Sequence, residues 1–113
     1  MDKYAEIECR LAEVLGYKTG CGENTDGAKI LLTVVDGKFI ELPRWARDNA
    51  AAFELMVEHE VMLEYYDDQV YAYADIDGIG LNWEVCKYES HPNKQAAVRF
   101  AIISAVVDKL EAE

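Results

Sequence analysis

The segment VMLEYYDDQVYAYADIDGIGLNWEVCKY, residues 61–88, decides the fold that we predict. Apolar and aromatic residues fill three runs, 61–66, 70–76 and 81–88, and turns rich in Asp and Gly separate them. Runs of this length between turn residues are typical of β-strands joined by hairpins. Small and aliphatic residues alternate with Tyr71 and Tyr73 in the middle run, so both of its faces are fairly apolar. We therefore expect that strand to be covered on both sides.

Another hairpin is predicted upstream of this segment. Two runs rich in Ile, Leu and Val, 29–35 and 38–42, flank Asp36-Gly37, which is a favoured two-residue hairpin turn. The Gly-rich segment 20–27 that precedes them is predicted to be a loop.

Three segments have the pattern of helices. Apolar residues recur at three- and four-residue steps in 2–15 and in the last helix, 92–110, for which Ser90 is the predicted N-cap. A middle helix is expected after its own cap, Asp48. The predicted core face of that helix consists of Ala52, Phe53, Met56 and Val57.

The element order is therefore α-β-β-α-β-β-β-α. Antiparallel strands flanked by helices make an α+β fold, and we expect one antiparallel sheet of about five strands in a helix–sheet–helix sandwich. At 113 residues, the chain is expected to form a single domain, 1–113.

The charge of the chain argues against several classes of partner. It has 22 Asp and Glu against 11 Lys and Arg, a net charge of −11. Affinity for phosphate comes mainly from cations, so we expect no direct binding to nucleic acid or to a membrane surface. Three cysteines without a CxxC pair, and the lack of an apolar signal or membrane-spanning segment, predict a cytoplasmic protein with reduced thiols.

Acidic residues and tyrosines gather between Asp48 and Cys86. This stretch holds ten acidic residues, no Lys or Arg, and four of the seven tyrosines. Charged runs are usually solvated surface, but a surface of one sign with aromatic residues also suits a basic protein partner. Because two Asp-rich turns flank the middle strand, we expect two acidic patches instead of one. The predicted interaction residues are Glu58, Glu60, Glu64, Tyr66, Asp67, Asp68, Tyr71, Tyr73, Asp75 and Asp77.

Catalytic chemistry has little support in the sequence. Asp75, Asp77 and Glu84 match part of a calcium-binding loop, but Tyr73 stands at its first ligand position and strands are predicted where the motif needs helices. We find no nucleophile–base pattern, no cofactor fingerprint and no metal-ligand spacing. We therefore expect no catalytic residues, no cofactor and no metal.

Two features of the C-terminal two thirds carry a resemblance. Ala50-Ala51-Ala52-Phe53 opens the middle helix, and a cap with Ser90 and Pro92 precedes a final helix that contains Ala97, Arg99 and Ala101. In these features the chain resembles the phage α/β/α-sandwich domain family, although members have Trp- and Gly-rich hairpins where this chain has Tyr and Asp. The resemblance implies a phage or prophage origin and supplies no catalytic residues.

Charge and resemblance together predict a small, non-enzymatic phage protein that binds a basic protein surface. The specific hypothesis is that the protein inhibits a host defence nuclease complex, as anti-CRISPR proteins do, in the cytoplasm of the bacterial host. One alternative is a small-molecule or nucleotide site lined by Arg44, Trp45 and Arg47, because an aromatic residue beside two cations suits an anionic ligand. Another is a homo-oligomeric structural or accessory phage protein that pairs through edge strands.

Overall fold

The computed structural model describes residues 3–23, 29–76 and 80–113. Its helices and antiparallel strands confirm the predicted α+β class. In chain order the elements are α1 (Lys3–Val14), β1 (Thr19–Glu23), β2 (Lys29–Val35), β3 (Lys38–Glu41), α2 (Asn49–Glu58), β4 (Met62–Tyr65), β5 (Gln69–Ile76), β6 (Gly80–Lys87), the 3-10 turn η1 (Tyr88–Ser90) and α3 (Lys94–Ala112).

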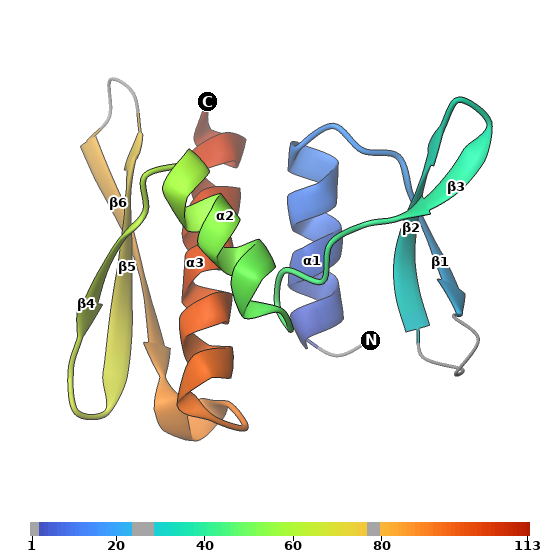
Figure 1. Cartoon of the computed structure of the whole chain (residues 1–113). Coiled ribbons are helices and arrows are strands. Elements are labelled where there is room, and N and C mark those ends of the chain that lie inside the picture. The colour runs from blue at the N-terminus through green and yellow to red at the C-terminus, as the bar shows by residue number, and fades with distance from the viewer. Residues whose placement is uncertain (1–2, 24–28, 77–79) are drawn as a thin grey trace.

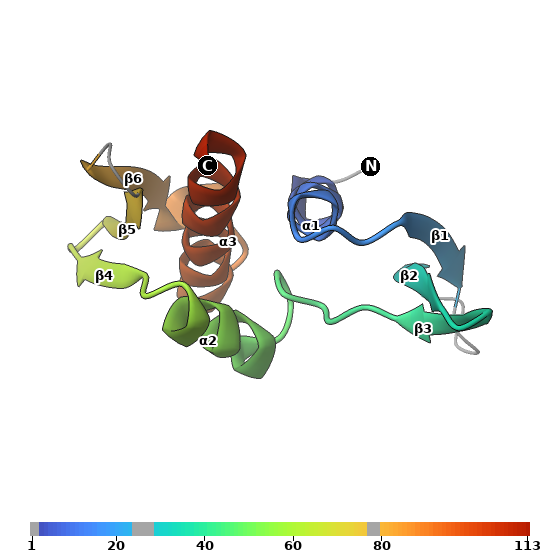
Figure 2. The same cartoon turned by 90° about the horizontal axis from the view of Figure 1, so that it is seen from above.

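The strands form two sheets of three, in the orders β1-β2-β3 and β4-β5-β6. The prediction of one sheet of about five strands is therefore wrong. Figure 1 shows the two sheets at opposite ends of the molecule with the helices between them, and Figure 2 shows the same arrangement from above. The predicted helix–sheet–helix layering is also wrong, because the helices lie in the middle and the sheets lie outside.

The extra strand, β1, comes from the segment that we predicted to be a loop. It pairs with β2 in a register that runs from Thr19 opposite Thr33 to Glu23 opposite Lys29. Glycine suits this edge strand, since a Cβ on Gly22 would lie only 2.7 Å from Leu32 Cδ1. The pairing of β1 with β2 adds a third strand to the β2–β3 hairpin. The rest of the predicted loop, 24–27, lies outside the described residues.

The predicted upstream hairpin is confirmed. β2 and β3 pair on either side of Asp36 and Gly37, whose φ angles are 52° and 76°. Two positive φ angles are what a tight hairpin turn of this kind requires, and Asp-Gly accepts them readily.

The helix α3 is the centre of the core. It packs against β5 and β6 and against both α1 and α2. Every residue from Ala101 to Val107 is buried. Its N-cap is Asn93, whose Oδ1 accepts a hydrogen bond from Ala96 N at 2.8 Å, so the predicted Ser90 cap is wrong. Ser90 lies instead in η1.

The cap of α2 is the predicted one, but its buried face differs. Asp48 Oδ1 accepts a hydrogen bond from Ala50 N at 2.9 Å. The buried residues of this helix are Ala51, Ala52 and Leu55. Of the predicted core face, Ala52 is buried and Met56 packs partly buried against the core, as predicted. The prediction is wrong for Phe53 and Val57, which are 58% and 59% exposed. The helix therefore packs through its alanines and one leucine, which lets it lie close against α3.

A buried carboxylate joins the N-terminal helix to the segment before α2. Glu8 Oε2 accepts a hydrogen bond from Ala46 N at 3.1 Å, and Arg99 Nε donates to Ala46 O at 2.9 Å. Both polar groups of Ala46 are therefore satisfied inside the molecule. No helix in the described ranges has the length and apolar character to cross a membrane.

Candidate functional site

The side chains of β5 point to two very different environments. Val70, Ala72 and Ala74 face α3 and are fully buried, as the alternation in the sequence predicts. Tyr71 and Tyr73 point to the opposite side of the sheet, and they are only partly buried. We call this side the outer face. It includes Met62, Glu64, Tyr66, Tyr71, Tyr73, Asp75, Leu81, Trp83, Val85 and Lys87.

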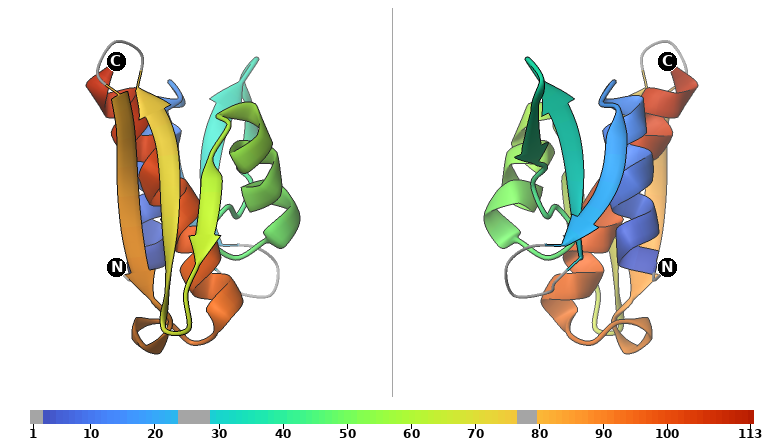
Figure 3. Two further views of the ribbon diagram at one scale, coloured as in Figure 1. Left: turned by 90° about the vertical axis from the view of Figure 1, so that its left-hand side faces the viewer. Right: turned by 90° about the vertical axis from the view of Figure 1, so that its right-hand side faces the viewer.

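Among the described elements, none covers the outer face. In the left view of Figure 3 the sheet β4-β5-β6 lies in front, and the helices lie behind it. Leu81 is 59% exposed and Trp83 is 56% exposed. The prediction that the middle strand is covered on both sides is therefore wrong, because the helices pack on one face of this sheet only.

Four aromatic side chains on the outer face are in contact. Tyr71 stacks on Trp83, with ring centroids 5.6 Å apart and an interplanar angle of 14°. The ring of Tyr66 meets that of Tyr71 edge-on at 5.2 Å, and Tyr73 lies 6.2 Å from Tyr71 on the same strand. The strand register produces this cluster, since Tyr71 pairs with Val85 and Tyr73 pairs with Trp83. Packed aromatic rings provide a firm apolar surface with polar edges.

A single carboxylate lies within this aromatic cluster. Glu64 accepts hydrogen bonds from the hydroxyl groups of Tyr66, at Oε1, and of Tyr73, at Oε2. The bond from Tyr66 to Glu64 raises the pKa of Tyr66 to about 12. Burial and the bond to Glu64 also raise the pKa of Tyr73. Both tyrosines therefore stay neutral donors near pH 7, and they hold Glu64 in place on the face.

The structure separates the predicted interaction residues into groups. Glu64, Tyr66, Tyr71 and Tyr73 lie together on the outer face, and Asp75 lies on the same face near the end of β5, opposite Leu81. Asp67 and Asp68 are exposed in the turn before β5, at its other end, and Asp77 lies outside the described residues. Glu58 and Glu60 are exposed at the end of α2 and just after it. They belong to other elements of the fold and make no part of the outer face.

The three residues of the alternative ligand site lie in different environments. Trp45 is buried in the core, where it packs as an ordinary apolar residue. Arg44 is exposed and forms a salt bridge with Glu41 at 3.0 Å. Arg47 is exposed in the turn that leads to α2. A groove between α2, α3 and β4 is lined by other residues.

Sequence reasoning missed the apolar side chains that β6 contributes to the outer face: Leu81, Trp83 and Val85. Their spacing in the segment LNWEVCK was the available signal, because alternate residues of a strand share one face. Read together with Tyr71 and Tyr73 across the hairpin, that spacing predicts an aromatic patch.

In the described part of the chain, no three His, Cys, Asp or Glu side chains lie together as possible metal ligands. Asp77, one of the residues that match a calcium-binding loop, lies outside that part. Comparison of the chain with protein-family models, with curated proteins and with solved structures found no match.

Proposed function

We propose that this protein acts by binding another protein through the outer face, and that the partner presents a basic surface there. The observation that supports this most strongly is the exposed Tyr71–Trp83 stack beside the carboxylate of Glu64. Tyr and Trp are enriched at protein interfaces, where they supply a large contact area at low entropic cost. A contiguous aromatic patch in water is also unfavourable until a partner covers it.

The charge around the outer face favours a cationic partner. Glu64 and Asp75 lie on the face, and Asp67 and Asp68 lie at the turn end of the sheet. The described residues of β4, β5 and β6 include one cation, Lys87, at the very end of β6. An arginine side chain suits this surface because its guanidinium stacks on aromatic rings and pairs with carboxylates.

The same charges argue against nucleic acid as the direct partner. Some RNA-binding sheets also expose aromatic residues, on which bases stack. Those surfaces carry Lys and Arg for the phosphates, and most of the binding free energy depends on them. A face with one terminal lysine and several carboxylates repels phosphate.

The phage origin, and a defence nuclease complex as the target, remain predictions that rest on the sequence resemblance. Such a complex holds its guide in a basic groove, and a basic groove is the kind of surface that the outer face suits. The proposal of a basic protein partner does not depend on this identification.

The first test is capture of the partner from bacterial lysate on immobilised protein, followed by affinity measurements at low and high salt. We expect binding to weaken steeply with salt. The double variant Asp67→Lys, Asp68→Lys should weaken it further, because these exposed acids lie at the end of the outer face. The matched control is Glu58→Lys, Glu60→Lys, which makes the same change in net charge on a different part of the molecule. Equal effects of the two double variants would show that only the total charge matters and would contradict the proposal.

A further inference from the structure

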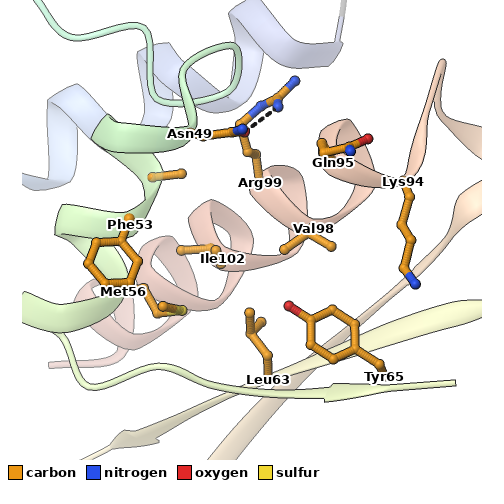
Figure 4. Close-up of a pocket in the computed structure, with 11 residues that line it drawn as sticks. Asn49, Phe53, Met56, Leu63, Tyr65, Lys94, Gln95, Val98, Arg99 and Ile102 are labelled. Atoms are coloured by element: carbon orange, nitrogen blue, oxygen red, sulfur yellow. Dashed lines mark hydrogen bonds between the residues drawn. The ribbon is translucent and has the colours of Figure 1, made fainter.

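A groove with an apolar lining opens between α2, α3 and β4. Its volume is about 400 Å³, within the range of about 300–1,000 Å³ that is typical of small-molecule sites. Figure 4 shows its apolar side chains, which come from all three elements: Phe53 and Met56 from α2, Val98 and Ile102 from α3, and Leu63 from β4. Phe53 is exposed, although the sequence predicts it in the core. Its ring forms part of the groove wall instead.

The charged residues that line the groove, Lys94 and Arg99, are both cations. Lys94 lies at one end beside Tyr65, and Arg99 lies at another side, where its Nη1 donates to Asn49 Oδ1 at 2.7 Å (Figure 4). None of the described residues that line the groove is Asp or Glu. In a chain of net charge −11, this is a local reversal of the charge.

The ammonium group of Lys94 is held by rings and is not neutralised by a carboxylate. Its Nζ lies 5.5 Å from the ring centroid of Tyr65 and 5.1 Å from that of Tyr88. No ion pair between described residues includes Lys94. Burial raises the pKa of Tyr88, and the charges of Tyr65, Asp68 and Asp67 raise it further. Asp67 and Asp68 are therefore close to Tyr88, but neither of them forms an ion pair with Lys94. Lys94 is also the first residue of α3, so the positive end of the helix dipole lies at the same place.

From this arrangement we propose that the groove binds a small amphipathic anion: an unbranched apolar chain that ends in a carboxylate. The chain lies against Met56, Leu63, Val98 and Ile102, where it removes apolar surface from water. The carboxylate lies at the Lys94 end and forms a charge-assisted hydrogen bond with Nζ. This site is separate from the outer face, so it stands whether or not that face binds a protein.

The test compares ligands with the same chain and different head groups. Decanoate and decyltrimethylammonium, each below its micelle-forming concentration, are titrated into the protein by calorimetry, with acetate as the control without a chain. Non-specific attraction to a protein of charge −11 favours the cationic ligand. We nevertheless expect decanoate to bind at least tenfold more tightly, with NMR shifts confined to the methyl groups of Met56, Leu63, Val98 and Ile102.

Two variants locate the head group and the chain. Lys94→Met should weaken decanoate about tenfold, and the matched control Lys38→Met, at an exposed site on β3, should leave its affinity unchanged. Val98→Phe fills the groove and should abolish binding, with thermal unfolding used to show that the variant is folded. Equal affinity for the two charged ligands, no binding of decanoate, or methyl shifts on the outer face would each overturn the proposal.

Discussion

The helix α2 offers a direct test of the packing, because sequence and structure place different residues in the core. The sequence analysis predicts Phe53 and Val57 as core residues. The structure buries Leu55, which is 4% exposed, and leaves Val57 59% exposed. The two single substitutions Leu55→Ala and Val57→Ala therefore distinguish the two arrangements.

The expected magnitudes differ several-fold. Leu55→Ala removes three buried carbon atoms, worth about 2.4 kcal/mol by transfer, and leaves a cavity that increases the cost to about 3 kcal/mol. For Val57→Ala, the loss of partial burial is offset by the better helix propensity of Ala, so the net change is within about 0.5 kcal/mol. In a domain of this size, about 3 kcal/mol corresponds to a decrease in Tm of about 12 °C.

The assay is urea unfolding of both variants and the parent, followed by circular dichroism, with thermal unfolding as a second measure. Parallel slopes in urea would show that the midpoints report stability alone. If Val57→Ala cost as much as Leu55→Ala, the orientation of α2 described above would be wrong, and so would the groove that it forms with α3.

Three other predictions follow from shifted pKa values. Glu64→Gln should lower the pKa of Tyr66 from about 12 toward its ordinary value of about 10, read from tyrosinate absorbance with Tyr66→Phe as the reference; an unchanged value would contradict the hydrogen bond. Burial and the positive charge of Lys3 lower the pKa of His91, so the stability that neutral His91 provides is full above about pH 6.5 and is lost as the pH falls below it. Between about pH 7.5 and 5.5, His91→Gln should therefore lose less in Tm than the parent does, and equal losses would refute this. Burial raises the pKa of Cys86 to about 11, so a thiol reagent at about pH 8 should modify Cys86 only in unfolded protein. Rapid labelling of Cys86 itself in the native protein, located by peptide mass spectrometry, would refute this.

The local elements of the fold were predictable from the sequence because their signals are local. Strands β4 to β6 and the β2–β3 hairpin follow from apolar runs between turn residues, and Asp48 caps α2 as predicted. The buried stretch of α3 follows from its nearly continuous apolar sequence. Turn chemistry and capping depend on a few neighbouring residues, so a single sequence contains the information.

The grouping of strands into sheets was not predictable in the same way. It depends on β1, whose sequence TGCGE has few of the β-branched and aromatic residues that mark strands. β1 is a strand because its backbone pairs with β2, and that pairing cannot be read from the composition of β1. The buried face of α2 was ambiguous for another reason: apolar residues occur on several sides of NAAAFELMVE, so periodicity alone does not choose between Leu55 and Val57.

The candidate site was predictable in part. Tyr71, Tyr73 and Glu64 were selected from the acid- and tyrosine-rich stretch, and the register places them together on the outer face. Glu58 and Glu60 were included because they are near in sequence, although the end of α2 is a different part of the surface. The groove near Lys94 was missed because its lining comes from three elements that are distant along the chain.

The central claim, that the outer face binds a basic protein partner, is tested most directly by comparing two exposed aromatic residues. Trp83 on the outer face is 56% exposed, and Phe39 on β3 is 78% exposed. Affinity for the captured partner is measured for Trp83→Ala and Phe39→Ala. We expect Trp83→Ala to cost at least about 2 kcal/mol, or about 30-fold in Kd, and Phe39→Ala to have no effect. Loss of binding with Phe39→Ala and full affinity with Trp83→Ala would contradict the account.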